Sequence, residues 1–187
     1  MSLRQRPTTR AFALGLLLAL SSAALAAARA ASAPLDFKLR TTDGGEITSE
    51  MVRGDVVVLA FGSSLLGPLS KEQAQEVQEL AEHFGAQNVR VYFVCTDSDS
   101  AKSRTYATDE QLRAFARKNG LKVAVLRDPD GALFKRTGAD QLPAIVILDR
   151  NGEISGAPLG GLDPNPSPNR KLVNVLSERL NKLIAAK

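Results

Sequence analysis

Apolar residues form several strand-like stretches with two different patterns along the chain. Residues 35–40 (LDFKLR) alternate apolar with polar side chains, which is typical of a strand with one buried face. Residues 55–61 (DVVVLAF) and 144–148 (AIVIL) are continuously apolar, which predicts central strands covered on both faces. Further strands are expected at residues 89–94, 123–126 and 153–155, and turn sequences predict hairpins at Asp43-Gly44-Gly45 and Asn151-Gly152.

Three stretches have apolar residues at helical spacing. The first begins at Pro68, which suits the first turn of a helix, and is expected to end with Gly85 in a left-handed conformation. The second begins with the capping-box pattern TDEQ at residues 108–111 and is expected to continue to Gly120. Residues 132–137 predict at most one short helical piece. The last helix is expected to bury one stripe, consisting of Leu172, Val175, Leu176, Leu180 and Leu183.

The order of these elements alternates strands with helices. It reads β-β-β-α-β-α-β-β-β-α, which predicts a mixed sheet with helices on both faces, a three-layer α/β sandwich. The length of 187 residues suits one domain, which we assign to residues 35–187. With 44% hydrophobic and 24% charged residues, the composition is that of a globular protein and excludes a disordered or disulfide-rich class.

The first thirty residues have the three-part pattern of a secretory signal peptide. Arg4, Arg6 and Arg10 precede the apolar run 11–20, and alanine-rich residues follow with candidate A-x-A cleavage sites. The apolar run is well short of the ~20 residues that a membrane-spanning helix needs, so a membrane anchor is disfavoured. We expect a Sec-type signal at residues 1–30, a short leader at 31–34, and a periplasmic or secreted protein without a membrane span.

Export changes the interpretation of the basic charge. The whole chain has 24 Lys and Arg residues against 20 Asp and Glu residues. Residues 1–30 contain four Arg and no acid, so the remainder has 24 − 4 = 20 basic and 20 acidic side chains, a net charge of zero. Because nucleic-acid binding depends on clustered Lys and Arg, no nucleic-acid partner is expected. The remaining charge runs are short and mixed in sign, which is typical of solvated faces.

Few residues could carry chemistry. Cys95 is the only thiol and could be a lone nucleophile or a small buried core residue, and the neighbouring acids Asp97 and Asp99 would raise its pKa. The only histidine, His83, lies near the end of the first helix without visible catalytic or metal-binding partners. The sequence Asp128-Pro129-Asp130-Gly131 only partly matches a calcium loop, and turn formation explains it better. We expect no metal site and no cofactor.

Three segments span most of residues 35–155, namely DFKLRTTDGGEIT, DVVVLAFGSSLLGPLSKE and RDPDGALFKRTGADQLPAIVILDRNGEI. In these segments the chain resembles the thioredoxin fold, and more narrowly the exported thioredoxin-like proteins of the alkyl hydroperoxide reductase/thiol-specific antioxidant (redoxin) family. The last segment is the most specific, because it combines a short helix, a proline, an apolar strand and Asp-Arg-Asn-Gly. The resemblance implies a cis proline facing the active site, with Leu142-Pro143 as the corresponding bond.

The chain departs from that family at the redox motif. Where thioredoxin-like members have Trp-Cys-Gly-Pro-Cys, this sequence reads Leu65-Leu66-Gly67-Pro68-Leu69, so both cysteine positions, Leu66 and Leu69, are leucine. A peroxiredoxin-type alignment places its reactive cysteine at Leu69 as well, and the buried acid of thioredoxins corresponds to Ala60. Leucine offers neither a nucleophile nor a redox couple, so dithiol exchange at this motif is excluded. No His or Lys base is evident beside the nearby hydroxyls of Ser63, Ser64 and Ser70.

These observations favour a binding role over an enzymatic one. A helix N-terminus beside a cis proline can pair with an extended polypeptide, so the leading hypothesis is a redox-inactive module that binds an extracytoplasmic protein or peptide. One alternative is a redoxin-type antioxidant or thiol oxidoreductase acting through Cys95, and another is a structural subunit of an envelope complex. The motif leucines either form an exposed patch or fold inward onto the helix. The expected binding groove consists of Leu65, Leu66, Gly67, Pro68, Leu69, Leu142, Pro143 and Ala144.

Overall fold

The computed structural model describes residues 33–160 and 171–186. The expected signal peptide and the first half of the expected leader therefore lie outside the described residues. The elements are β1 (Lys38–Thr41), β2 (Glu46–Thr48), η1 (Glu50–Val52), β3 (Val56–Gly62), α1 (Pro68–Phe84), η2 (Gly85–Gln87), β4 (Val89–Cys95), α2 (Asp109–Lys118), β5 (Val125–Arg127), η3 (Pro129–Gly131), α3 (Ala132–Arg136), β6 (Ala144–Leu148), β7 (Leu159–Gly160) and α4 (Leu172–Ala185).

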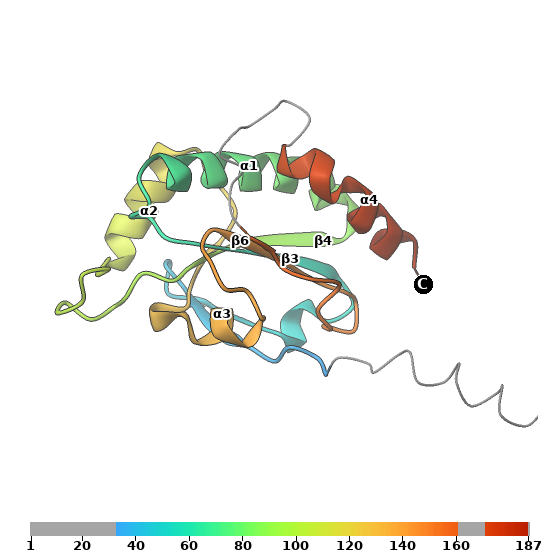
Figure 1. The fold of residues 1–187 in the computed structure, drawn as a ribbon, viewed down its shortest axis with the longest axis horizontal. Coiled ribbons are helices and arrows are strands. Elements are labelled where there is room, and N and C mark those ends of the chain that lie inside the picture. Colours follow the sequence, from blue (N-terminus) through green and yellow to red (C-terminus); the bar gives the residue numbers. More distant parts are fainter. Residues whose placement is uncertain (1–32, 161–170, 187) are drawn as a thin grey trace, which may run out of the picture. The chain divides into compact units, whose positions relative to one another are not determined.

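The strands form one sheet with the order β2-β1-β5-β4-β3-β6-β7. β4 pairs in parallel with β3 and with β5, whereas the other pairings are antiparallel. Helices α1, α2 and α4 cover one face of the sheet, and α3 lies against the other (Figure 1). The expected mixed sheet in a three-layer α/β sandwich is confirmed.

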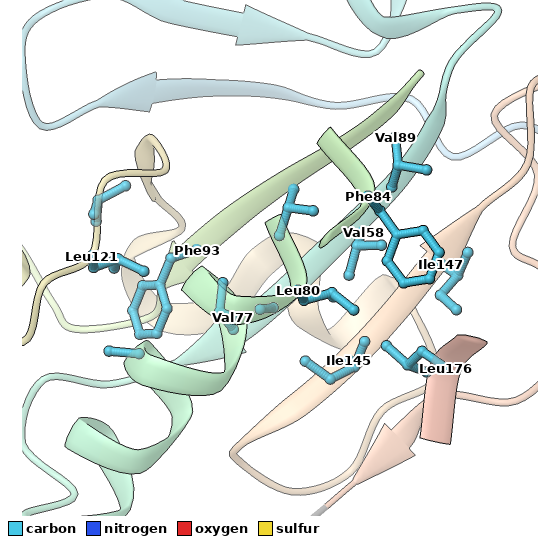
Figure 2. Close-up of a cluster of buried hydrophobic side chains, with 14 of the residues drawn as sticks. Val58, Val77, Leu80, Phe84, Val89, Phe93, Leu121, Ile145, Ile147 and Leu176 are labelled. Atoms are coloured by element: carbon cyan, nitrogen blue, oxygen red, sulfur yellow. The ribbon is translucent and has the colours of Figure 1, made fainter. Parts of the chain in front are cut away.

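Strand β3 lies at the centre of the sheet, and all seven of its residues are buried. Its side chains enter two apolar clusters in turn, because successive residues of a strand point to opposite faces. Val58 belongs to the cluster that includes Leu80 and Phe84 of α1 (Figure 2). Phe61 belongs to the cluster on the other face, where its ring centroid lies 5.5 Å from that of Phe134. Burial on both faces explains why this stretch of the sequence is continuously apolar.

Two expectations about the helices are wrong. Gly85 does not end α1 in a left-handed conformation; its φ is −58°, and the chain continues into η2. The left-handed residue is Asn88, with φ 59°, and asparagine tolerates this conformation better than most residues. In α4 the side chain of Val175 is 49% exposed, whereas Val173 is buried in line with Leu176. The buried face of α4 therefore includes Val173 in place of Val175, so it is rotated about the helix axis from the expected face.

The expected strand at residues 153–155 is also wrong. Ile154 forms only an isolated bridge to Leu148 after the Asn151-Gly152 turn. The strand that continues the sheet is β7, which pairs with the start of β6. The turn at Asn151-Gly152 is present as expected. After the single bridge at Ile154 the chain leaves β6, and it pairs with β6 again only at β7. Among the described residues, no helix is long and apolar enough to cross a membrane.

Candidate functional site

The carboxyl ends of β3, β4 and β5 meet at one edge of the sheet, because these strands run parallel. In the register of the sheet, Gly62 lies opposite Cys95, and Cys95 lies opposite Arg127. The loop that follows β3, residues 63–67, is therefore brought beside Asp97, which follows β4. The motif that departs from the redoxin pattern falls on this loop and on the first turn of α1. This edge is the candidate functional site.

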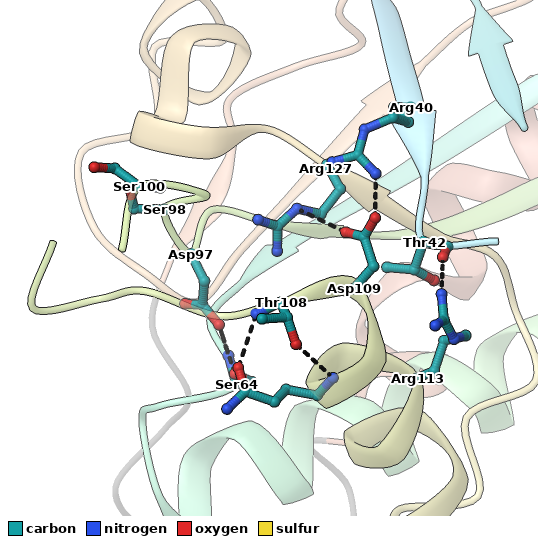
Figure 3. Close-up of polar contacts among 11 residues, drawn as sticks. Arg40, Thr42, Ser64, Asp97, Ser98, Ser100, Thr108, Asp109, Arg113 and Arg127 are labelled. Atoms are coloured by element: carbon teal, nitrogen blue, oxygen red, sulfur yellow. Dashed lines mark hydrogen bonds and ion pairs between the residues drawn. The ribbon is translucent and has the colours of Figure 1, made fainter. Parts of the chain in front are cut away.

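A buried carboxylate holds the start of this loop in place. Asp97 is 1% exposed, and one of its oxygens accepts a hydrogen bond from the Ser63 hydroxyl group. Its other oxygen accepts from the Ser64 hydroxyl group (Figure 3). The backbone N–H of Ser64 also donates to Asp97 over 2.9 Å. A carboxylate has about four lone-pair positions, so three of them are used within the protein. We interpret this cluster of Ser63, Ser64 and Asp97, called the loop clasp below, as a structural fastening.

The sequence pattern does not predict the loop clasp, because it shows no His or Lys base beside these serines and does not place Asp97 near them. The relevant signal was present, because Ser63 follows one buried strand by one residue and Asp97 follows the next buried strand by two. Neighbouring parallel strands end at the same sheet edge, and polar residues just after them commonly meet there. The contact between Ser63 and Asp97 follows from the sequence only once β3 and β4 are known to pair in parallel.

The first turn of α1 is closed by a third serine. The Ser70 hydroxyl donates to the carbonyl of Ser63 over 2.6 Å and accepts from the backbone N–H of Leu66 over 2.9 Å. The N–H of Leu65 donates to the Ser63 hydroxyl over 3.1 Å. Free amides at a helix N-terminus stabilise a thiolate or another anion. The amides of Leu65 and Leu66, just before this helix, already have partners inside the chain, so these two are not free to bind an anion.

The motif leucines take different positions at this edge. Leu65 is 53% exposed and Leu69 is 42% exposed, whereas Leu66 is half-buried. The sequence left open whether the motif leucines form an exposed patch or fold inward onto the helix. Leu65 and Leu69 are exposed. Gly67 and Pro68 between them are exposed as well. Large apolar side chains at this level of exposure are few in the described part of the chain, and two of them lie together on this turn.

The second part of the expected groove lies on β6 and the residues before it. The Leu142–Pro143 peptide bond is cis, as the resemblance implied. Pairing of Ala144 with Phe61 places this bond across from the end of β3. Leu142 is half-buried, and its backbone forms no hydrogen bond to another described residue. Ala144, however, is buried between β3 and β7, where it pairs with Gly160 on its other side, so a peptide strand cannot add to it.

Cys95 is fully buried beneath the loop clasp. Burial, and second to it the nearby negative charge of Asp97, together raise the pKa of its thiol to about 12. At pH 7 only on the order of one thiol in 100,000 is then ionised. The thiolate is the nucleophilic form of cysteine, so this environment disfavours both metal binding and disulfide exchange.

The buried thiol predicts a loss of stability at alkaline pH. Its folded pKa of about 12 lies above the unfolded value of 9.0, so the folded state holds the proton more tightly. The contribution is complete below pH 9 and is lost as the pH rises from 9 towards 12. From pH 8 to pH 10.5, the free energy of unfolding in urea should fall by about 2 kcal/mol more for the wild type than for Cys95→Ala. An equal pH dependence in both proteins would contradict the assigned environment.

A second polar cluster, also unexpected, lies where β5 ends. Arg127 is 3% exposed, and its Nε lies 3.5 Å from a carboxylate oxygen of Asp109 at the start of α2. Arg40 of β1 donates to the other oxygen of Asp109 (Figure 3). The Nη1 of Arg127 has no hydrogen-bond partner in the described part of the chain. The interpretation of charged residues as solvated faces therefore fails for Arg127, which is held inside by its carboxylate partner.

The other candidates have structural roles. His83 is exposed in the last turn of α1, with its ring edge-on to Phe84 at 4.6 Å. Asp128 accepts hydrogen bonds from the backbone N–H groups of Leu133 and Phe134 at 2.9 and 2.8 Å, so it caps α3 rather than binding an ion. Over residues 33–160 and 171–186, no three His, Cys, Asp or Glu side chains are grouped so that they could hold a metal ion.

Solved structures with the same fold share little sequence with this chain. A hypothetical protein from Sinorhizobium meliloti is 19% identical with a TM-score of 0.67, covering 83% of this chain and 85% of that chain. A secreted disulfide oxidoreductase from Mycobacterium tuberculosis, homologous to DsbE of E. coli, is 20% identical with a TM-score of 0.57, covering 82% and 97%. StoA from Bacillus subtilis is 21% identical with a TM-score of 0.55, covering 71% and 92%. These likenesses show the thioredoxin-like fold.

Sequence comparison gives a more specific result at the family level. No curated protein matches the chain significantly. The model of the AhpC/TSA family matches residues 30–157, which include the loop clasp, the motif leucines and the cis proline. This match covers more than half of the chain and agrees with the fold. The chain therefore belongs to the AhpC/TSA family.

Proposed function

We propose that this chain is an exported member of the family that binds a polypeptide at the edge of its sheet and does not exchange electrons. The observation that carries this proposal is the exposure of Leu65 and Leu69 on the turn where the family's redox motif would lie. Exposed apolar side chains that lie together commonly mark an interaction surface. We call Leu65, Leu69 and Leu142, which lies two residues before the partner of Phe61 on β6, the leucine edge.

The lack of a usable thiol supports the absence of redox chemistry. The chain has one cysteine, and both positions that match the family motif, Leu66 and Leu69, carry hydrocarbon side chains. The remaining thiol of Cys95 is buried and has a pKa of about 12. A disulfide or peroxide could reach this atom only if the surrounding fold opened locally, because Cys95 is 0% exposed. The alternative of a thiol enzyme acting through Cys95 therefore has little physical support.

The chemistry of the leucine edge favours an extended, apolar polypeptide segment as the ligand. Leu65 and Leu69 offer apolar contact area but no charge. The backbone N–H and C=O of Leu142 can pair with a main chain that passes beside the cis proline, since neither bonds to another described residue. Backbone pairing supplies affinity in this mode of recognition, while side-chain pockets supply specificity. The signal-peptide pattern of residues 1–30 supports export, and hence a partner outside the cytoplasm.

Affinity capture tests the proposal directly. The chain, immobilised after removal of residues 1–30, is incubated with the solubilised envelope or secreted fraction of its source, and bound proteins are identified. The proposal predicts a specific partner that is released by a peptide copying the bound segment. A partner that remains attached only while a disulfide to Cys95 is intact would instead support the thiol enzyme. A partner retained by a variant lacking the leucine edge would support a structural subunit that assembles through another face.

A further inference from the structure

A pocket outside the leucine edge has lining residues that suit an anionic ligand. It has a volume of about 190 Å³ and lies between α2, the segment that follows α2, and the turn between β1 and β2. Its apolar lining includes Leu121 and Val125, which are both buried. Its polar lining includes three cationic side chains and one carboxylate: Arg113, Arg117, Lys122 and Asp43. None of these residues belongs to the proposed polypeptide site.

Two arginines of the pocket, Arg113 and Arg117, repel each other on α2 and so destabilise this helix slightly. Arg113 and Arg117 are four positions apart on α2, so they lie on the same face of the helix, where like charges repel. Among the described residues, neither guanidinium forms an ion pair with a carboxylate. Lys122 lies 3.9 Å from Glu82, and both of these side chains are largely exposed. Asp43 and Glu82 offset part of the positive charge of the pocket, and the two guanidinium groups leave the lining with a net positive charge.

Part of this charge is fixed in position. The Nη1 of Arg113 donates a hydrogen bond to the backbone carbonyl of Thr42, another lining residue (Figure 3). The backbone N–H of Lys122 donates to Gln78 of α1 over 2.7 Å, which fixes the segment after α2. Guanidinium groups bind carboxylates through parallel hydrogen bonds, and a group already held in place loses less entropy on binding.

We propose that this pocket binds a small organic carboxylate with an apolar body about the size of a benzene ring. By volume alone, the 190 Å³ pocket, which is open to solvent, has room for a benzene-sized body, since a cavity of about 150 Å³ takes up benzene. Leu121 and Val125 form the apolar part of its lining. The carboxylate would lie at Arg113 and Arg117. The same chemistry occurs in free acids and at the C-terminus of a polypeptide that ends in an apolar residue, and the probes below separate these two sources.

Titration of the isotope-labelled protein with benzoate, followed through backbone amide resonances, tests this site. We expect saturable shifts in residues 113–125, and none from the uncharged isostere benzamide or from acetate, which lacks the apolar body. Arg117→Gln should weaken benzoate binding about tenfold or more. The matched control is Lys118→Gln, which removes the same charge from the same last turn of α2 but does not line the pocket. It should change the affinity less than about twofold.

The outcomes separate the proposal from its alternatives. Absence of saturable benzoate binding, equal binding of benzamide, or equal weakening by Lys118→Gln would each overturn it. A tripeptide that ends in phenylalanine with a free carboxylate distinguishes the two natural sources. Tighter binding than benzoate assigns the pocket to polypeptide C-termini, and weaker binding assigns it to free carboxylates. Because Arg117 is exposed, its replacement leaves the fold intact, and the test does not depend on the leucine edge.

Discussion

Leu65→Asp is expected to abolish capture of the polypeptide partner while leaving the fold intact. The Leu65 side chain is 53% exposed in the free protein, so the new carboxylate is hydrated there and stability should change by less than about 0.5 kcal/mol. In the complex the carboxylate would be buried against an apolar segment without a partner. That desolvation costs a few kcal/mol, which corresponds to a loss of affinity of about 30-fold or more. Calorimetric titration with the captured partner measures this loss, and a melting curve checks the fold.

Met51→Asp is the matched control for this variant. Met51 is 60% exposed on η1, outside the leucine edge, so the same new charge appears on an equally exposed apolar position. Its affinity for the partner should equal that of the wild type. If both variants lost affinity equally, the effect would come from net charge. If Leu65→Asp kept full affinity, the leucine edge would not be the binding surface.

Asp97→Ala is expected to lower the free energy of unfolding by about 3 kcal/mol, the largest stability change among these predictions. It removes the acceptor for two hydroxyl groups and one backbone N–H, those of Ser63 and Ser64. Each donor that is left unpaired inside a protein costs about 1–3 kcal/mol. Urea unfolding at pH 7 gives the value directly. The loop before α1 would also be less well fixed, so partner affinity should fall together with stability.

Asp99→Ala provides the comparison for Asp97→Ala. Asp99 lies two residues further along the same segment and is exposed, with no hydrogen bond or ion pair to another described residue. Its replacement should change stability by less than about 0.5 kcal/mol. Equal effects of the two substitutions would mean that general charge reduction, rather than the loop clasp, determines the result.

The fold could be predicted from the sequence because its elements carry strong local signals. The continuous apolar run of β3, the capping box at Thr108 and Gln111, and Pro68 at the start of α1 each have a direct local cause, and the structure contains all three. The errors lie where several local solutions have similar energies. The end of α1 passes into a 3-10 turn, and the chain after Asn151-Gly152 forms only one bridge before β7.

The candidate site was less predictable, because its contacts join residues far apart in the sequence. Ser63 and Asp97 are 34 residues apart and meet only through the parallel register of β3 with β4. Arg127 is buried because Asp109, on a different element, lies beside it. No local pattern distinguishes these charged residues from solvated ones. The leucine replacements and the cis proline could be located from the family resemblance, but the exposure of Leu65 depends on how the loop is fastened.

The most direct measurement is the rate at which the purified protein accelerates electron transfer from dithiothreitol to a disulfide such as insulin or to hydrogen peroxide. Wild-type protein and Cys95→Ser are compared with buffer alone under identical conditions. With hydrocarbon at both motif positions and its remaining thiol protonated and covered, the wild type should give the background rate, as should the variant. Repeated turnover by the wild type that disappears in Cys95→Ser would contradict the account.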